Sequence, residues 1–143
     1  MGSLFFEKMK EYRILYLKQT LFEANAYTTH GVNEINSLKN EINKLAVRHF
    51  FSIESYRNGV RKYLPLKNKI PIRYSNKLFL FYIKIKQDES YYINYYSILK
   101  ICFNEKVVII FKNGEILELN IPVKVILKEI RKVEIISNYL NNL

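Results

Sequence analysis

Few of the residues that build common catalytic and metal sites occur in this chain of 143 residues. It has one cysteine, Cys102, which excludes an intramolecular disulfide and a zinc site built from cysteines. Its four glycines do not form a phosphate-cradling loop or a Gly-x-Gly-x-x-Gly motif. No apolar run approaches the roughly 20 residues that span a bilayer. Cys102 lies in the apolar run ILKICF, where we expect a buried and inert thiol.

Groups that exchange protons near neutral pH are equally scarce. The two histidines, His30 and His49, have no Asp or Glu pattern beside them, and no serine sits in a glycine elbow. The adjacent carboxylates Asp88 and Glu89 fall in an expected turn, where hydration is their ordinary state. We therefore expect a binding protein rather than an enzyme, with no catalytic residue, no metal and no cofactor.

The first residues predict a cytoplasmic protein. MGSLFFEKMKEY becomes charged within its first seven residues and offers no small-residue cleavage site. Phe6 stands where the myristoylation pattern requires Ser or Thr. We expect no association with membranes.

Acidic residues are missing altogether from residues 55–87. This acid-free segment holds nine of the 23 Lys and Arg residues, so the other 14 nearly balance the 13 Asp and Glu that lie outside it. A general drift toward lysine would raise the count everywhere and would not empty one segment of acids. The segregation favours a surface for a polyanion. The plainer alternative is the lysine-rich composition of an AT-rich genome.

The apolar pattern predicts an α+β fold in a single domain over residues 1–143. We expect an antiparallel sheet of about five or six strands, one internal helix and a C-terminal helix. Residues 12–29 predict one or two strands. With Asn33 as N-cap, the helical spacing of the apolar residues that follow predicts a helix to about Phe50.

Turn residues then organise the middle of the chain. Asn58-Gly59 predicts a turn, and the two prolines at 65 and 71 predict extended chain. LFLFYIKIK alternates and predicts a half-buried strand whose outer lysines also discourage edge aggregation. YYINYYSILKICF predicts one further strand, with a bulge near residues 94–97.

The last third predicts a β-hairpin and a helix. In VVIIFKNGEILELNI, two apolar runs flank Asn113-Gly114, which suits a type I′ turn. Pro122 suits the first turn of a helix that continues to the end of the sequence. We expect one side of this helix to be apolar, with Ile126, Leu127, Ile130, Val133 and Leu140, and the opposite side to be basic, with Lys124, Lys128, Arg131 and Lys132. Because Glu129 and Glu134 dilute the basic side, we interpret it as a solvated helix face.

Three stretches, in order, resemble the ComK family of competence transcription factors. FFSIESYRNGVRKYL resembles a Phe-rich segment of the family with Ser-Tyr and Gly-Arg pairs. IPIRYSNKLFLF resembles its Pro-Ile segment, polar turn and Phe-rich strand. YYINYYSILKI and VVIIFKNGEILELNI resemble the strand and Phe-x-Asn-Gly hairpin that precede a helix. The resemblance runs from about Asn36 onward.

This resemblance implies sequence-specific binding of AT-rich double-stranded DNA, largely through the minor groove, by dimers that activate transcription. The partner in the dimer would be a second copy or a longer relative. The acid-free segment lies within the matched region, where arginines suit a narrow minor groove and lysines suit phosphates. The expected DNA-binding residues are Arg57, Arg61, Lys62, Lys67, Lys69, Arg73 and Lys77. Tyr56, Tyr63 and Tyr74 interleave with them, and we expect these tyrosines to pack.

Departures from the family keep other functions open. Phe81-Tyr82 replaces the family's Phe-Pro, and the sequence stops at Leu143, before the C-terminal extension of longer members. Both features favour an alternative, a protein-interaction or regulatory paralogue that lacks its own activation function. The hairpin and following helix are also similar to LytTR response-regulator domains, although the cations at 57–73 precede the hairpin. RNA binding is a further alternative.

Overall fold

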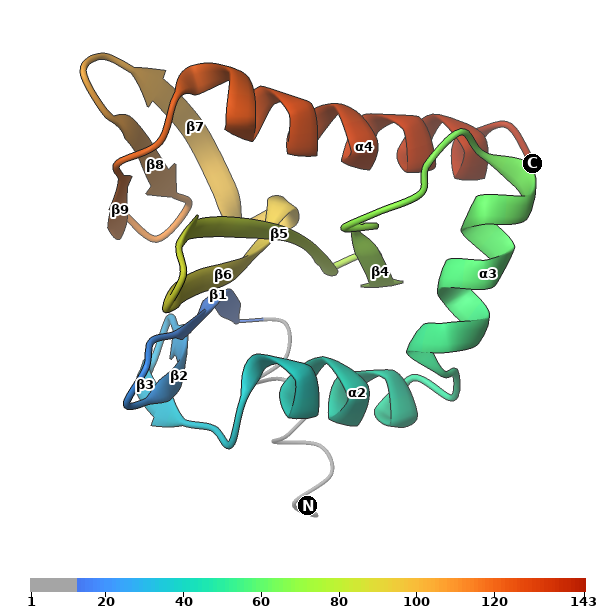
Figure 1. The fold of residues 1–143 in the computed structure, drawn as a ribbon, viewed down its shortest axis with the longest axis horizontal. Coiled ribbons are helices and arrows are strands. Elements are labelled where there is room, and N and C mark those ends of the chain that lie inside the picture. Colours follow the sequence, from blue (N-terminus) through green and yellow to red (C-terminus); the bar gives the residue numbers. More distant parts are fainter. Residues whose placement is uncertain (1–12) are drawn as a thin grey trace.

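The computed structural model describes residues 13–143 and contains two antiparallel sheets and three α-helices in that range (Figure 1). The larger sheet has the strand order β3-β2-β1-β6-β5-β4, and the smaller has the order β7-β8-β9. The strands are β1 (Ile14–Gln19), β2 (Ala24–Thr28), β3 (Gly31–Glu34), β4 (Ile72–Ser75), β5 (Leu78–Lys86), β6 (Glu89–Asn94), β7 (Ile98–Phe103), β8 (Val107–Phe111) and β9 (Ile116–Leu119). The helices are α2 (Leu38–Arg48), α3 (Ile53–Tyr63), α4 (Val123–Asn141) and the short 3-10 helix η1 (Tyr95–Ser97). The expected α+β class is confirmed.

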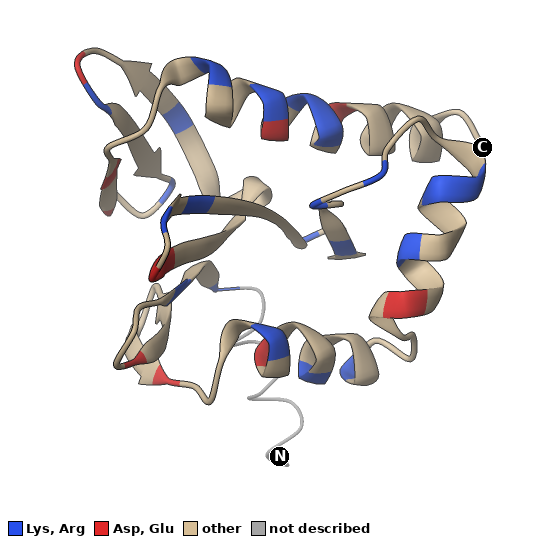
Figure 2. Ribbon diagram, viewed as in Figure 1, with Lys and Arg blue, Asp and Glu red and all other residues tan. Residues whose placement is uncertain are grey.

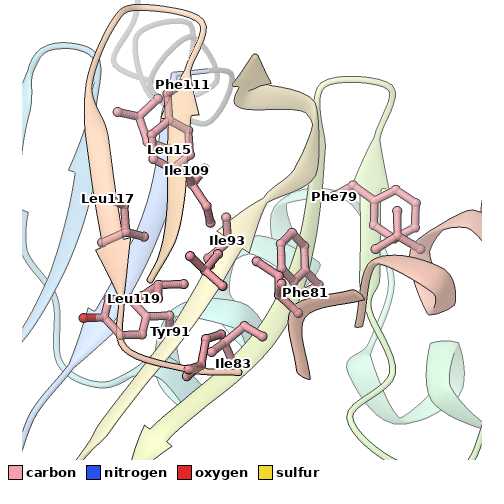
Figure 3. Close-up of a cluster of buried hydrophobic side chains, with 14 of the residues drawn as sticks. Leu15, Phe79, Phe81, Ile83, Tyr91, Ile93, Ile109, Phe111, Leu117 and Leu119 are labelled. Carbon is pink, nitrogen blue, oxygen red and sulfur yellow. The ribbon is translucent and has the colours of Figure 1, made fainter. Parts of the chain in front are cut away.

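The helices cover both faces of the six-stranded sheet. Figure 1 shows α2 below this sheet, α4 above it, and α3 running between the two beside β4. One buried cluster joins α2 to the lower face and includes Leu45, Ile72 and Leu80. A second cluster joins the upper face to the small sheet and α4, through side chains such as Phe81 and Ile109 (Figure 3). The protein therefore has three layers with a core on each side of the central sheet.

The internal helical region contains two helices where the sequence predicted one. The expected turn at Asn58-Gly59 is wrong, because both residues lie inside α3. The Ser52 side chain caps α3 by accepting a 3.1 Å hydrogen bond from Ser55 N. Val60 packs against the upper core. Capping and packing therefore outweigh the turn preference of the dipeptide.

The first helix also begins later than expected. Asn33 is not its N-cap; it lies in β3, where it pairs with Ala26 of β2. The cap of α2 is Ser37, whose side chain accepts a 3.0 Å hydrogen bond from Asn40 N. Gln19 adds a second cap, since its Oε1 accepts from Leu38 N at 2.8 Å. The residues just after Gly31 therefore complete the sheet before the helix begins.

The stretch YYINYYSILKICF forms two strands, so the expected single bulged strand is wrong. β6 belongs to the large sheet and β7 to the small one, with η1 between them. The chain turns at Asn94, whose side chain is fully buried and accepts from Phe79 N at 3.0 Å. Its Nδ2 donates to Ile14 O and Ser97 Oγ, both at 2.9 Å, and to Lys77 O at 3.2 Å. One buried amide thus fixes the corner between the two sheets.

The β8–β9 hairpin is confirmed, but its turn is not of type I′. That turn needs positive φ at two residues, and only Gly114, with φ of 91°, has it here. Gly114 N donates to Phe111 O, and Phe111 N donates to Glu115 O, each at 2.9 Å. This is the three-residue hairpin loop in which glycine occupies the left-handed position. Asn113 instead accepts from Glu115 N through its side chain, at 3.1 Å.

Other side-chain expectations are partly corrected. Phe79, Phe81 and Ile83 are buried on one face of β5, as the alternation predicted, and Lys84 and Lys86 are exposed. The first half of β5 is not half-buried as expected, because Leu78 and Leu80 are buried on the opposite face. In the last helix, Pro122 is the N-cap and Leu127 is 47% exposed rather than buried, because its position points away from the core. Cys102 is only half-buried, because it lies on β7, an edge strand of the small sheet.

Candidate nucleic-acid interface

The seven expected DNA-binding residues do not form one patch. They occupy α3, the segment 64–71, β4 and the β4–β5 turn. Arg61, Lys62 and Lys67 lie close together at the C-terminal end of α3, and all three are exposed. The other four, Arg57, Lys69, Arg73 and Lys77, point to different surroundings.

A hydrogen bond fixes the end of α3 to the segment that follows it. Arg61 Nε donates to Lys67 O at 3.1 Å, and Arg61 Nη1 donates to Asn58 Oδ1 at 3.4 Å. The Lys62 ammonium lies 5.5 Å from the ring centre of Tyr63. Tyr63 is 62% exposed, and its ring centroid lies 6.2 Å from that of Tyr139 on α4. The exposed ring of Tyr63 therefore lies beside the cations at the end of α3.

The segment 64–71 also joins α3 to the basic side of α4. Lys132 Nζ donates to Asn68 O at 3.0 Å and to Glu129 Oε1 at the same distance. Residues four apart on a helix are neighbours, so Lys124 and Lys128 continue the row that ends at Lys132. Figure 2 shows Lys and Arg along α4, on the segment 64–71 and at the end of α3. We name the α3–α4 basic surface as the exposed residues Arg61, Lys62, Lys67, Lys124, Lys128 and Arg131, while the largely buried Lys132 joins the two stretches.

The two acids that seemed to dilute the basic side of α4 have other positions. Glu129 is only 5% exposed, and its carboxylate is held by Lys132. Glu134 lines a hollow with Arg73 and Tyr95. Two residues apart on a helix corresponds to about 160° around the axis, so Glu134 points away from Lys132. Glu129 therefore does not dilute the charge of Lys124 and Lys128, whereas the exposed Glu134 is a neighbour of Arg131, three residues earlier on the helix.

Lys69 lies on the other face of the central sheet. Its φ of 51° is in the left-handed region, and its ammonium is 5.8 Å from the ring centre of Tyr82. Tyr82 is paired with Tyr92, with ring centroids 5.1 Å apart. Arg57 approaches the same rings from α3; burial raises the pKa of Tyr92, and the Arg57 guanidinium partly opposes that shift. Arg57 is half-buried, so packing accounts for its position.

Arg73 is held by two tyrosines. Its main-chain N donates to the Tyr56 hydroxyl at 3.1 Å, and its Nε donates to the Tyr96 hydroxyl at 3.3 Å. The Tyr56 hydroxyl donates to Pro71 O at 2.7 Å, and burial raises the pKa of Tyr56 to about 12. The expectation that the tyrosines pack is confirmed for Tyr56, and also for Tyr74, which is buried.

Lys77 is exposed in the β4–β5 turn. It faces a hollow together with Lys112 of the β8–β9 turn. Sequence reasoning placed it with the other cations because it follows them in the chain. The structure places it beside the hairpin.

The described residues include no group of three or more His, Cys, Asp or Glu side chains placed to hold a metal ion. His30 contacts Arg13 Nη1 at 3.1 Å and Thr29 Oγ1 at 2.9 Å. Among residues 13–143, no helix is long and apolar enough to cross a membrane.

The spacing of Lys124, Lys128 and Lys132 puts all three in one row, which we interpreted from the sequence as part of a solvated helix face. The proximity of this row to residues 61–67, which sequence reasoning missed, depends on tertiary packing. Comparison with family models, with curated proteins and with solved structures gives no match to this chain, so the ComK resemblance remains a prediction from the sequence.

Proposed function

We propose that this protein binds double-stranded DNA through the α3–α4 basic surface and acts as a transcription regulator of the ComK type. The observation that supports this most directly is the contact between Lys132 and Asn68, which brings two basic stretches of the sequence together. The acid nearest to this contact, Glu129, is buried and paired. The surface that remains is strongly positive, as a polyanion requires.

Two lysines of this surface, Lys124 and Lys128, are exposed along α4 and would contact phosphates, which positions the protein without reading the sequence. Arg131 is exposed, and an arginine suits a narrow minor groove, where the negative potential of AT-rich DNA is strongest. The proposed preference for AT-rich promoters rests on this property and on the ComK resemblance. The stacked Tyr63–Tyr139 pair supplies an aromatic contact beside the cations.

Binding would depend steeply on salt. Each neutralised phosphate contributes about −0.9 to the slope of log affinity against log salt. If five to seven phosphates are contacted, we expect a slope of roughly −4 to −6 and dissociation constants between nanomolar and micromolar.

The test compares two double variants with a control of equal charge. Lys62→Gln/Lys67→Gln and Lys128→Gln/Arg131→Gln each remove two cations from the α3–α4 basic surface. Lys39→Gln/Lys106→Gln removes two exposed cations from α2 and from the β7–β8 turn. Arg61 is left in place because its side chain donates a hydrogen bond to the Lys67 carbonyl. Each variant is titrated with labelled AT-rich and GC-rich duplexes of equal length at two salt concentrations.

We expect tighter binding to the AT-rich duplex by the wild type. Each surface variant should bind at least tenfold more weakly, with a salt slope smaller by roughly two, because two phosphate contacts are lost. The control should bind as the wild type does. If all three variants weaken binding equally, the interaction depends only on the net charge of the protein. An affinity that does not change with salt concentration would contradict the proposal.

A second candidate is a protein-interaction module that works as a dimer. It is favoured by the outer face of the small sheet, where Val108, Ile110 and Ile116 point away from the core. Ile116 is 58% exposed. A second copy of the chain would bury this face. Ile116→Lys should then convert a dimer to a monomer in sedimentation experiments. Leu127→Lys, which changes an exposed apolar residue on α4, should not. A wild-type monomer that binds DNA would argue against this candidate.

A further inference from the structure

Three turns that are distant in the sequence meet at one end of the protein, around a hollow of about 460 Å³. The β2–β3 turn contributes Thr29, the β4–β5 turn contributes Asn76 and Lys77, and the β8–β9 turn contributes Lys112 and Asn113. Tyr96 and Ser97 of η1 and Leu15 of β1 complete the lining. Only Lys77 among these was expected to bind anything.

The lining has the chemistry of an anion site. It offers two ammonium groups and two side-chain amides that can donate hydrogen bonds, whereas the Ser97 hydroxyl already donates to Ile14 O at 2.8 Å. Among the described residues, no carboxylate lines the hollow. Glu115, the acid that follows the hairpin turn, is not among the lining residues. Its charge helps to raise the pKa of Tyr16, which burial mainly raises to about 12. Ammonium and amide donors that line one hollow suit the oxygens of a phosphate group.

The frame around the hollow is fixed by buried hydrogen bonds. Asn94 binds the main-chain oxygen of Lys77 and the hydroxyl of Ser97 at the same time. The hairpin is attached to the same frame, since Lys112 N donates to Ser97 O at 2.9 Å. The two lysines therefore project from backbone positions that one buried residue holds together. Such preorganisation lowers the entropy lost when a ligand binds.

Additional positive charge lies beside the hollow. Thr29 N donates to Arg13 O at 3.1 Å, which keeps Arg13 next to the β2–β3 turn. Arg13 also contacts His30 through Nη1. The end of the molecule formed by these turns thus carries three permanent cations from three separate parts of the chain.

We propose that this hollow is a phosphate-binding site, held by Lys77, Lys112 and the polar groups of the three turns. The phosphate belongs either to a small phosphorylated molecule or to the backbone of a nucleic acid. The inference does not rest on the proposed function, because the α3–α4 basic surface lies elsewhere and a phosphate probe needs no DNA.

The experiment uses inorganic pyrophosphate at constant ionic strength. Backbone amide shifts are followed by NMR, and affinity is measured by calorimetry. We expect saturable shifts at Lys77, Ser97 and Asn113. Lys77→Gln and Lys112→Gln should each weaken binding by about tenfold or more, because a charged hydrogen-bond donor is lost. Lys106→Gln, at the opposite end of the small sheet, is the matched control and should leave the affinity unchanged.

A duplex with 5′-hydroxyl ends separates the two sources of phosphate. If pyrophosphate binds as described, the ligand is a small phosphorylated molecule. If pyrophosphate causes no shifts but the duplex shifts the same amides, and Lys77→Gln and Lys112→Gln weaken only duplex binding, the ligand is backbone phosphate. The site is refuted if neither probe shifts these amides, or if Lys106→Gln weakens binding as much as the other two variants. Loss of duplex binding in Lys62→Gln/Lys67→Gln with pyrophosphate binding retained would concern only the proposed function.

Discussion

The Lys132 ammonium donates a 3.0 Å hydrogen bond to the main-chain carbonyl of Asn68, 64 positions earlier in the chain. The same ammonium pairs with Glu129 at 3.0 Å, and their side chains are only 12% and 7% exposed. One lysine therefore satisfies a buried carboxylate and also fixes the segment 64–71 against α4. This contact unites the acid-free segment with the basic row of the last helix.

Replacing Lys132 by Met should destabilise the protein by about 3 kcal/mol, because the Glu129 carboxylate would stay buried without its partner. Urea denaturation measures the change. The double variant Lys132→Met/Glu129→Leu should recover most of the lost stability, since an apolar pair replaces the ion pair. An additive loss in the double variant would show that the pairing contributes little.

The fold was predictable where local patterns and tertiary packing agree. The alternation in β5 and the glycine turn of the β8–β9 hairpin are local signals, and the structure confirms the strand β5 and the hairpin. α3 was missed because its sequence contains a turn dipeptide, while its stability comes from the Ser52 cap and from packing against the sheet. The division between β6 and β7 was missed because nothing local shows that Asn94 is buried.

The candidate interface was predictable only in part, for the same reason. The absence of acids marked Arg61, Lys62 and Lys67 correctly as exposed neighbours. The same absence also selected Arg57, which packs against Tyr92, because charge composition carries no information on the direction of a side chain. The sequence placed Lys128 on a basic side diluted by acids, because the burial of Glu129 cannot be predicted from the sequence.

Asn94 should be among the least replaceable residues of the protein. Its amide group donates to Ile14 O, Lys77 O and Ser97 Oγ, and its oxygen accepts from Phe79 N. Asn94→Asp should lower the free energy of unfolding by about 3 kcal/mol or more, because a carboxylate would face carbonyl oxygens that need donors. The measurement is chemical denaturation at pH 7. Asn76→Asp, in the exposed β4–β5 turn, is the control and should change stability by less than about 0.5 kcal/mol.

Phe50 should be replaceable by glycine with a gain in stability. It has a φ of 65° at the end of α2 and its side chain is 93% exposed. Phe50 N donates to Val47 O at 3.0 Å and Phe51 N donates to Ala46 O at 3.1 Å, the helix-ending pattern in which glycine is preferred. Phe50→Gly should therefore stabilise the fold by about 0.5–1 kcal/mol. In contrast, Val47→Gly, inside the exposed side of the same helix, should destabilise it by a similar amount. Thermal melts of both variants measure these changes. A lower melting temperature for Phe50→Gly would mean that the Phe50 side chain has a structural role.

Alkaline pH should unfold the protein through its buried tyrosines. Burial raises the pKa of Tyr16 and Tyr56 to about 12, and raises that of Tyr74 well above its usual value. In the unfolded chain these hydroxyls ionise near pH 10, so above that pH the unfolded state binds fewer protons than the folded state. Their contribution is therefore complete below pH 10 and is lost as the pH rises through 12. Tyrosinate absorbance should show a phase that coincides with loss of circular dichroism. Tyr56→Phe should reduce the steepness of this phase. A single phase near pH 10 with the fold intact would show that these hydroxyls are not shielded from solvent.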